Sequence, residues 1–198
     1  GWSGGIPPSG LPTTLFNRFT NITIPKGSEI HSASISYRPR FNANYTGVHL
    51  VVEAHATDNA SAPADRSDVV SAPRTTNSTS WSIGSVTAGT RIDTPDITDV
   101  IQEIVDRSGW SSGNALVIFV GDNGTTINGA ANFSTYDENS AYAPILTIDY
   151  TPSNSAPTIT VNPSVNYNGY TRLGPNNSPG SIGFTATDPE ETGSNPLS

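Results

Sequence analysis

The sequence predicts an all-β fold with one short helix, and three observations carry this prediction. First, 16 Pro and 18 Gly divide the 198 residues into short segments, because both residue types interrupt regular structure. Second, several of these segments alternate apolar and polar residues, which is the period of a half-buried strand. Third, a helical period is clear only in residues 94–107. Strands are therefore expected to cover the apolar face of that helix.

The helix is expected over about residues 95–107. Thr94 is the expected N-cap and Pro95 suits the first helical position, while Gly109 follows the last turn. Five apolar residues recur at helical spacing and line one face. They are Ile97, Val100, Ile101, Ile104 and Val105.

Strands are expected on both sides of the helix. They span residues 15–24, 29–41, 47–58, 78–83, 86–92, 115–120, 126–136 and 144–150. Residues 47–58 alternate most regularly, and 115–120 form a continuous apolar run that is typical of a buried strand. Residues 59–76 are expected to be a long polar connection.

The chain is expected to have four parts. They are an arm at 1–14, a main domain at 15–151, a linker at 152–157 and an incomplete domain at 158–198. Gly and Pro exclude a helix or a central strand from the arm. In a free arm, apolar side chains such as Trp2, Ile6 and Leu11 would be exposed to water. The arm is therefore expected to dock as a donor strand.

Composition limits the possible partners and the compartment. A net charge of −8 and an isoelectric point near 4.6 argue against nucleic acid and anionic membrane, which need a basic face. The absence of Cys excludes disulfides and thiolate metal sites. No apolar run is long enough to span a bilayer. The absence of Met favours a processed chain or a fragment, and we expect a secreted or cell-surface location.

Residues 15–151 resemble the bacterial extracellular modules of the DNRLRE type. The matching stretches are, in order, RFTNITIPKG at 18–27, EAHATDN at 53–59, TPDIT at 94–98, QEIV at 102–105, GWSSGNAL at 109–116 and APILTIDY at 143–150. The resemblance implies an antiparallel jelly-roll sandwich of two sheets, in large secreted or surface proteins. Such modules have a further strand where this chain has its arm, so a sheet could be one strand short.

Residues 155–198 resemble the opening of a bacterial Ig-like or cadherin-like repeat, through residues 156–161 and 183–191. A complete β-sandwich of this kind needs about 100 residues. Two or three strands leave an unpaired edge, so the rest is expected from a continuing chain or from another copy. The resemblance also implies structural calcium at Asp188 and Glu190, with an ordinary acidic turn as the alternative. No other cofactor is expected.

Seven Asn-x-Ser/Thr triplets are candidate sites for N-linked glycans. They begin at Asn21, Asn44, Asn59, Asn77, Asn123, Asn132 and Asn176. A chain rich in Asn, Ser and Thr also contains such triplets by chance. Modification of neighbouring Ser or Thr is a further alternative.

No catalytic residue is predicted, and the chain is not expected to be an enzyme. G-x-S-x-G occurs at residues 1–5 and 109–113, but a nucleophile elbow needs a preceding strand and a later His. The last His is His55. His49 and His55 share a strand face, yet six residues at about 3.3 Å each place them too far apart for one metal ion.

Two functions remain as hypotheses. The first is a non-catalytic structural subunit of a fibre, filament or adhesive stalk, in which copies join head to tail by β-strand donation. Its expected partners are copies of itself and covalent glycans. The alternative is a carbohydrate-binding module of a larger secreted protein, with Trp81, Tyr136 and Tyr142 as sugar-stacking candidates, whereas Trp110 is expected in the core.

Overall fold

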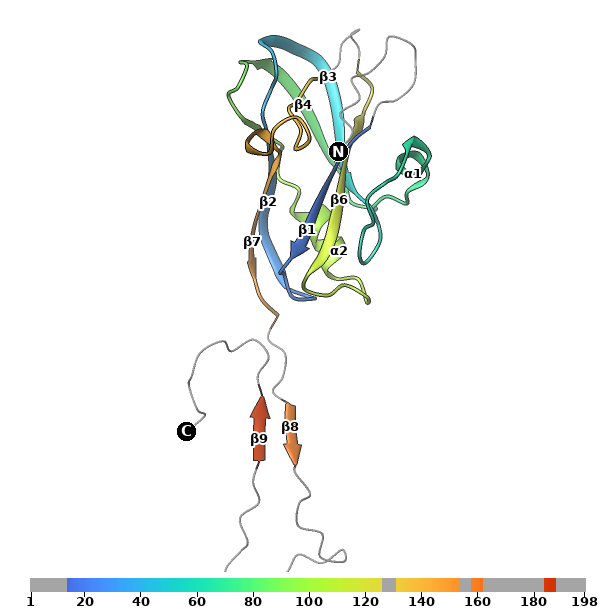
Figure 1. The fold of residues 1–198 in the computed structure, drawn as a ribbon, viewed down its shortest axis with the longest axis vertical. Helices are drawn as coiled ribbons and strands as arrows, with labels where there is room; N and C mark the ends of the chain where they lie inside the picture. The colour runs from blue at the N-terminus through green and yellow to red at the C-terminus, as the bar shows by residue number, and fades with distance from the viewer. Residues whose placement is uncertain (1–13, 126–130, 154–157, 162–183, 188–198) are drawn as a thin grey trace, which may run out of the picture. The chain divides into compact units, whose positions relative to one another are not determined.

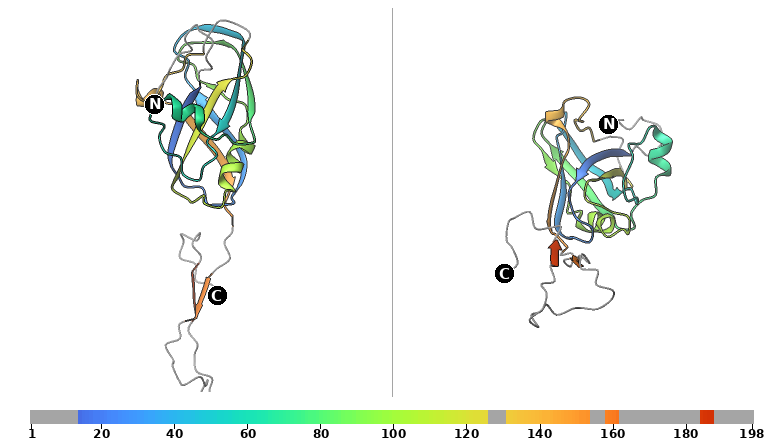
Figure 2. Two further views of the ribbon diagram at one scale, coloured as in Figure 1. Left: turned by 90° about the vertical axis from the view of Figure 1, so that its right-hand side faces the viewer. Right: turned by 60° about the horizontal axis from the view of Figure 1, so that its bottom comes forward.

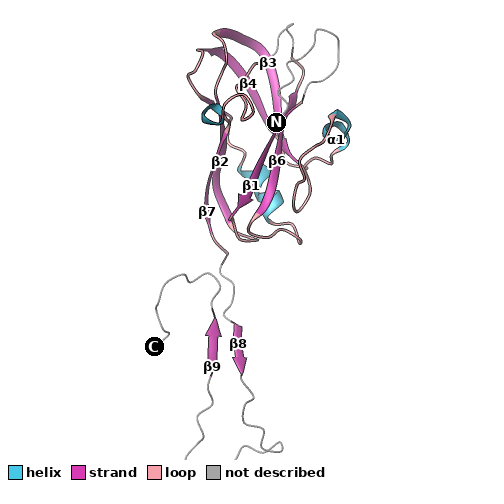
Figure 3. Ribbon diagram, in the orientation of Figure 1, coloured by secondary structure: helices cyan, strands magenta, loops and turns pink. Residues whose placement is uncertain are grey.

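The computed structural model describes residues 14–125, 131–153, 158–161 and 184–187. The chain divides into two compact units, residues 1–153 and residues 154–198. The first unit holds two antiparallel sheets and little helix (Figures 1 and 3). The predicted all-β sandwich with a short helix is therefore confirmed.

Sheet A has the strand order β1-β6-β3-β4, and sheet B has the order β5-β2-β7. All neighbouring strands in both sheets are antiparallel. The elements are β1 (Leu15–Ile22), β2 (Glu29–Tyr37), β3 (Ala43–Ala54), α1 (Arg66–Ser71), β4 (Thr79–Val86), β5 (Ile92–Asp93), α2 (Thr98–Val105), β6 (Asn114–Asp122), the short 3-10 turn η1 (Ser140–Tyr142) and β7 (Ile145–Thr151).

The core lies between the two sheets and is closed by α2. All five residues of the predicted helical stripe are fully buried, at 0% exposure, and each such burial contributes about 1.5–3 kcal/mol relative to exposure. Trp110 is 2% exposed, and its indole N–H donates to the Ile24 carbonyl at 3.0 Å. The predicted core positions of the stripe and of Trp110 are therefore confirmed.

The helix begins at Thr98, later than predicted, because the preceding residues extend the pairing of β2. The Thr94 N–H donates to the Ile35 carbonyl (3.0 Å), and the Thr94 hydroxyl oxygen accepts from the Ile35 N–H (3.1 Å). The Asp96 carboxylate accepts from the Ala33 N–H (3.1 Å). The predicted N-cap at Thr94 is thus wrong: Ile97 occupies the N-cap position, and the Asp96 carboxylate accepts from the N–H of Thr98, the first residue of α2, at 3.1 Å.

A second helix, α1, lies within the expected polar connection at 59–76. Asp65 caps it, since its carboxylate accepts from two N–H groups of the first turn at 2.7 and 3.1 Å. Val69 is the buried residue of α1 and packs in a small cluster with Val117 and Phe119. The helix therefore covers the outer face of sheet A (Figure 2).

Two strand predictions were wrong in detail. The segments 78–83 and 86–92 were expected to be two strands. Instead, one strand, β4, continues from Thr79 to Val86, and the second segment contributes only Ile92 to the two-residue strand β5. In the expected strand at 126–136, the part from 131 onward forms only an isolated bridge between Pro39 and Phe133.

The described part of the second unit is a two-stranded antiparallel sheet. It pairs β8 (Thr158–Val161) with β9 (Phe184–Thr187). Both strands fall within the segments that the Ig-like resemblance identified, residues 156–161 and 183–191. Ile159 pairs with Ala186 and Val161 with Phe184, while the other two pairs join threonines.

Candidate functional site

One side of the sandwich is closed and the opposite side is open. On the closed side, β4 is an edge strand, yet its core-facing residues Trp81, Ile83 and Val86 are 5%, 5% and 8% exposed. The Thr79 hydroxyl donates to the Asp96 carbonyl (3.0 Å), so the start of β4 lies beside the segment between β5 and α2, and the Trp81 ring stacks with Tyr37 and Phe133. Burial at an edge strand thus depends on what closes that edge.

On the open side, the edge strands are β1 in sheet A and β7 in sheet B. Core-facing apolar residues of both strands contact the core but are only partly buried. We name these six residues the seam: Leu15, Phe19 and Ile22 of β1, and Leu146, Ile148 and Tyr150 of β7. Sheet A contributes four strands and sheet B three, one of which has two residues. The open side is therefore the side on which sheet B could accept a further strand.

At the outer edge of β7, some backbone N–H and C=O groups have no partner among the described residues. Ala33 and Ile35 of β2 direct their N–H and C=O groups toward residues 94–97. Their β7 partners in register are Ile148 and Leu146. Because hydrogen-bonding direction alternates along an antiparallel strand, the N–H and C=O groups of Leu146 and Ile148 point away from β2. None of these groups bonds to another described residue.

The edge of β7 carries little of the protection that exposed edges need. Natural edge strands are blunted by bulges, prolines or several charges. Pro144 and Pro152 flank β7, but none lies inside it, and Asp149 is its one charged residue. The register shift in the β2–β7 pair falls on β2 between Ile30 and Ser32. β7 itself is thus a regular seven-residue edge.

The other edge, β1, is irregular. Its pairing with β6 shifts between Phe19 and Ile22, where Asn21 has a left-handed φ of 56°. The Asn17 amide donates to the hydroxyl of the fully buried Tyr37 at 2.6 Å, which ties β1 to sheet B. Burial raises the pKa of Tyr37, and the Asn17 bond opposes that shift. A bulged edge is a poorer template for another strand than a regular one.

Trp81 was expected as a sugar-stacking residue, and this expectation is wrong. It points from β4 into the core and is 5% exposed. Its ring stacks with Tyr37 and Phe133 at centroid distances of 5.6 and 5.8 Å. No face of the indole is open to a ligand.

The exposed aromatic residues gather instead where residues 38–41 lie beside residues 132–142. Tyr136 is 68% exposed and Phe41 57%. The Arg40 and Glu138 side chains link the two segments at 3.1 Å. Tyr142 is less available, because the guanidinium of Arg38 lies 3.9 Å from its ring centroid. Phe41 was missed as a candidate, since a single aromatic residue in a loop gives no sequence signal.

Six glycosylation triplets fall on described residues and differ in accessibility. Five of these asparagines are exposed (Asn21, Asn44, Asn59, Asn77 and Asn123) and Asn132 is half-buried. The Asn44 Oδ1 accepts from the N–H (3.0 Å) and the hydroxyl (2.6 Å) of Thr46. In contrast, the hydroxyl residue of the Asn132 triplet, Ser134, is 2% exposed.

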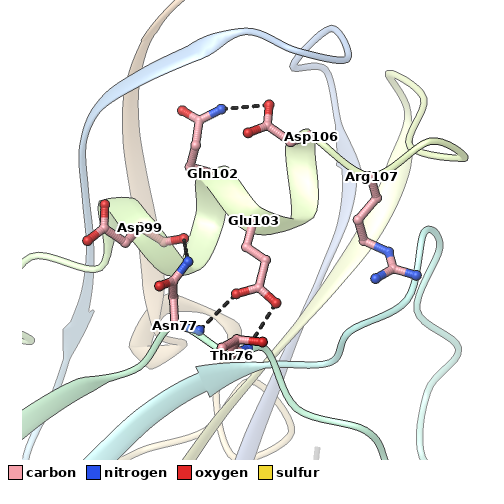
Figure 4. Close-up of a pocket in the computed structure, with 7 residues that line it drawn as sticks. All are labelled: Thr76, Asn77, Asp99, Gln102, Glu103, Asp106 and Arg107. Carbon is pink, nitrogen blue, oxygen red and sulfur yellow. Dashed lines mark hydrogen bonds between the residues drawn. The ribbon is translucent and has the colours of Figure 1, made fainter.

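A shallow depression lies beside α2, with a volume of about 530 Å³ (Figure 4). Three carboxylates line it, those of Asp99, Glu103 and Asp106. Glu103 uses both oxygens to accept from the N–H groups of Thr76 (2.9 Å) and Asn77 (2.8 Å). These bonds hold the turn before β4 against the helix, so the depression has a structural role.

Of the remaining candidate residues, His55 has its Nδ1 buried without a hydrogen-bond partner among the described residues. His49 bonds to Ser82 at 2.9 Å and Glu53 faces Arg74 at 3.7 Å. Ser111 of the G-x-S-x-G pattern lies in a turn between α2 and β6. The described residues contain no group of three His, Cys, Asp or Glu side chains able to hold a metal ion.

Several predicted site residues lie outside the described part of the chain. They are the calcium candidates Asp188 and Glu190, the triplet at Asn176, and the arm residues Trp2, Ile6 and Leu11.

No family model matches the chain, and no curated protein matches it. Within its described residues, no helix is long and apolar enough to cross a membrane. The geometry of the open side therefore carries the functional argument.

Proposed function

We propose that this protein is a non-catalytic structural subunit of a secreted or cell-surface assembly, in which copies join head to tail by β-strand donation. The observation that carries the proposal is the open side of the sandwich, where the half-buried seam lies along the free edge of β7. An added strand would satisfy the free backbone groups and cover the seam, which is how strand addition generally gains affinity.

The energetic gain is divided between backbone and side chains. Completing the burial of each partly buried Leu, Ile or Phe contributes up to about 1 kcal/mol. Each new backbone hydrogen bond contributes about 1 kcal/mol net. Because the donor and the acceptor are different surfaces of the same chain, the contact is heterologous and propagates as a filament.

The experiment that tests this function is sedimentation velocity of the purified full chain over a range of concentrations, with electron microscopy of the largest species. We expect species heavier than the 20.7 kDa chain, with lengths that increase with concentration. A chain that sediments as a monomer at every concentration contradicts the proposal.

A second candidate function is carbohydrate binding, and the exposed rings of Tyr136 and Phe41 favour it. Exposed aromatic faces bordered by polar groups can stack on sugar rings, and Arg40 with Glu138 supplies such groups. The test is retention on insoluble polysaccharides of the full chain against the Tyr136→Ala variant. Equal behaviour of the two proteins, or no retention, argues against this candidate.

Covalent glycans form part of the primary proposal, with Asn44 as the first site. Its side chain is exposed, and the Thr46 hydroxyl that completes the triplet is exposed as well. Peptide mass mapping of native material should find a glycan on Asn44 and none on Asn132, whose neighbour Ser134 is buried. The reverse distribution contradicts this assignment.

A further inference from the structure

We propose that the acceptor is the outer edge of β7, and that its occupant is residues 1–6 of a second copy, paired antiparallel. This inference rests on the proposed function and specifies its interface. It assigns the edge, the donor segment and the register of the contact.

The choice of β7 follows from a comparison of the edge strands. At β4 the core-facing residues are already buried, at 5–8% exposure, so an added strand there gains little. β1 is bulged near Asn21. β5 has two residues. β7 alone combines a regular edge, free backbone groups and half-buried apolar side chains among these strands.

The register follows from the positions of the free groups. Leu146, Ile148 and, by the same alternation, Tyr150 present outward N–H and C=O groups and inward side chains. In an antiparallel pair, residues directly opposite each other share a face. A donor must therefore place its own bonding residues opposite these three, with their side chains toward the seam.

Residues 1–6 meet this requirement when Trp2, Gly4 and Ile6 stand opposite Tyr150, Ile148 and Leu146. The three donor positions all keep their N–H groups, since the first proline of the arm is Pro7. Pro7 would stand opposite Ile145, at a position whose N–H points away from β7. Pro8 then falls on a bonding position, so the pairing ends there. In this register the side chains of Trp2 and Ile6 face the seam, and Gly4 lies between them without a side chain.

A second copy is favoured over the chain's own arm by direction. β1 and β7 run the same way (Figure 1), so an antiparallel donor must run opposite to the β1 that follows it. Within one chain, the direction would have to reverse between Ile6 and Leu15. Pro7, Pro8 and Pro12 occupy that stretch, and proline-rich segments favour an extended conformation that spans about 3.1 Å per residue. An extended spacer suits a neighbouring copy.

The first experiment compares two substitutions at one edge position. Leu146→Pro removes an N–H that points away from β2, so the β2–β7 pairing keeps its own bonds, while the free edge loses a donor. Leu146→Ala removes side-chain volume but keeps that N–H, and it is the matched control. Because Leu146 also belongs to the seam, we expect the alanine variant to polymerise more weakly than the unsubstituted chain by sedimentation velocity, and the proline variant to remain monomeric, with the same circular dichroism spectrum.

The second experiment uses the absence of cysteine from the chain. In the proposed register Gly5 lies opposite Thr147, and both positions face away from the core. They form a non-hydrogen-bonded pair, in which the two Cα atoms are about 4.5 Å apart. That distance permits a disulfide. Mixing the Gly5→Cys variant with the Thr147→Cys variant should give a disulfide-linked dimer under mild oxidation. Gly5→Cys mixed with Asp149→Cys is the out-of-register control and should give at least ten-fold less.

The outcomes separate the interface from the function. Polymers that persist in Leu146→Pro, without the Gly5–Thr147 crosslink, overturn the β7 assignment but leave assembly intact. A monomeric Gly5→Cys/Thr147→Cys double variant that forms an internal disulfide shows that each chain uses its own arm and overturns the second-copy assignment. Monomers in every variant, the unsubstituted chain included, contradict the proposed function itself.

Discussion

Gly109 shows how one residue position is fixed by a contact distant in sequence. A Cβ atom at this position would collide with the carboxylate of Asp58. That carboxylate accepts from the Arg107 guanidinium at 2.7 Å. Glycine therefore lets the loop after β3 approach the end of α2, which gives the GWSSG segment a structural explanation.

The substitution Gly109→Ala should lower the free energy of unfolding by about 1–3 kcal/mol, as overpacking generally does. The matched control is Gly84→Ala in β4, where no atom lies within 4 Å of the added Cβ. The control should be neutral or about 0.5 kcal/mol more stable, because glycine weakens a strand. Chemical denaturation measures both, and equal effects would show that Asp58 does not restrict position 109.

His55 makes stability depend on pH. Its pKa is lowered by burial first, and then by the positive charges of Arg74 and Arg107. The unfolded chain therefore binds a proton at a higher pH than the folded chain does. The stabilising contribution is present above the unfolded pKa of about 6.5 and is lost as pH falls through the folded pKa.

The variant His55→Gln should remove this dependence. Denaturation midpoints of the unsubstituted chain should decrease as the pH is lowered below about 6.5, and those of the variant should change less over the same interval. His31 is exposed at the start of β2, so His31→Gln is the control and should keep the original slope. Parallel slopes for all three proteins would contradict the assignment.

At the scale of elements, α2 is held by hydrogen bonds as well as by its apolar stripe. Glu103 accepts from two N–H groups of the turn before β4 (Figure 4). Glu103→Ala leaves both groups without this acceptor and should destabilise the fold by about 1–3 kcal/mol. Asp99→Asn, on the same helix, loses only a favourable dipole interaction of about 0.5 kcal/mol. Thermal denaturation compares the two, and a larger loss for Asp99→Asn would be the contrary result.

The sequence predicted the elements whose pattern is local. The stripe of α2 and the strands β1, β2, β3 and β7 follow from periodicity, because burial repeats every second residue or every third to fourth, whereas β6 follows from its continuous apolar run. The start of α2 could not be predicted in this way. Thr94 has the side chain of an N-cap, but it bonds to Ile35, which is far away in sequence, and tertiary pairing prevailed over local preference.

The candidate site was predictable only in part. The sequence predicts the arm and a missing strand, yet nothing in residues 145–151 marks β7 as an open edge. Its alternation is the same as that of a central strand. Trp81 was predicted to be exposed and is buried. An aromatic residue on a strand can point to the core or to solvent, and the register of β4 with β3 decides which. Edges and faces are properties of the assembled sheets.

At the scale of the whole molecule, each unit leaves strand edges without partners among the described residues. The first unit has the free edge of β7, and the second has a sheet of two strands. A two-stranded sheet alone is marginally stable in water. Under the proposed strand donation, a neighbouring copy would stabilise the free edge of β7, so the denaturation midpoint should rise with protein concentration.

Charge gives the last prediction, because every copy carries −8. Like-charged copies repel one another, whereas the proposed contact uses backbone hydrogen bonds and apolar side chains. Raising ionic strength from about 0.01 M to about 0.15 M shortens the Debye length from about 30 Å to about 8 Å. Assembly should therefore strengthen with salt, and sedimentation velocity at a fixed protein concentration should show heavier species. An assembly held by ion pairs would respond in the opposite direction, and weakening by salt would exclude strand donation as its main source of affinity.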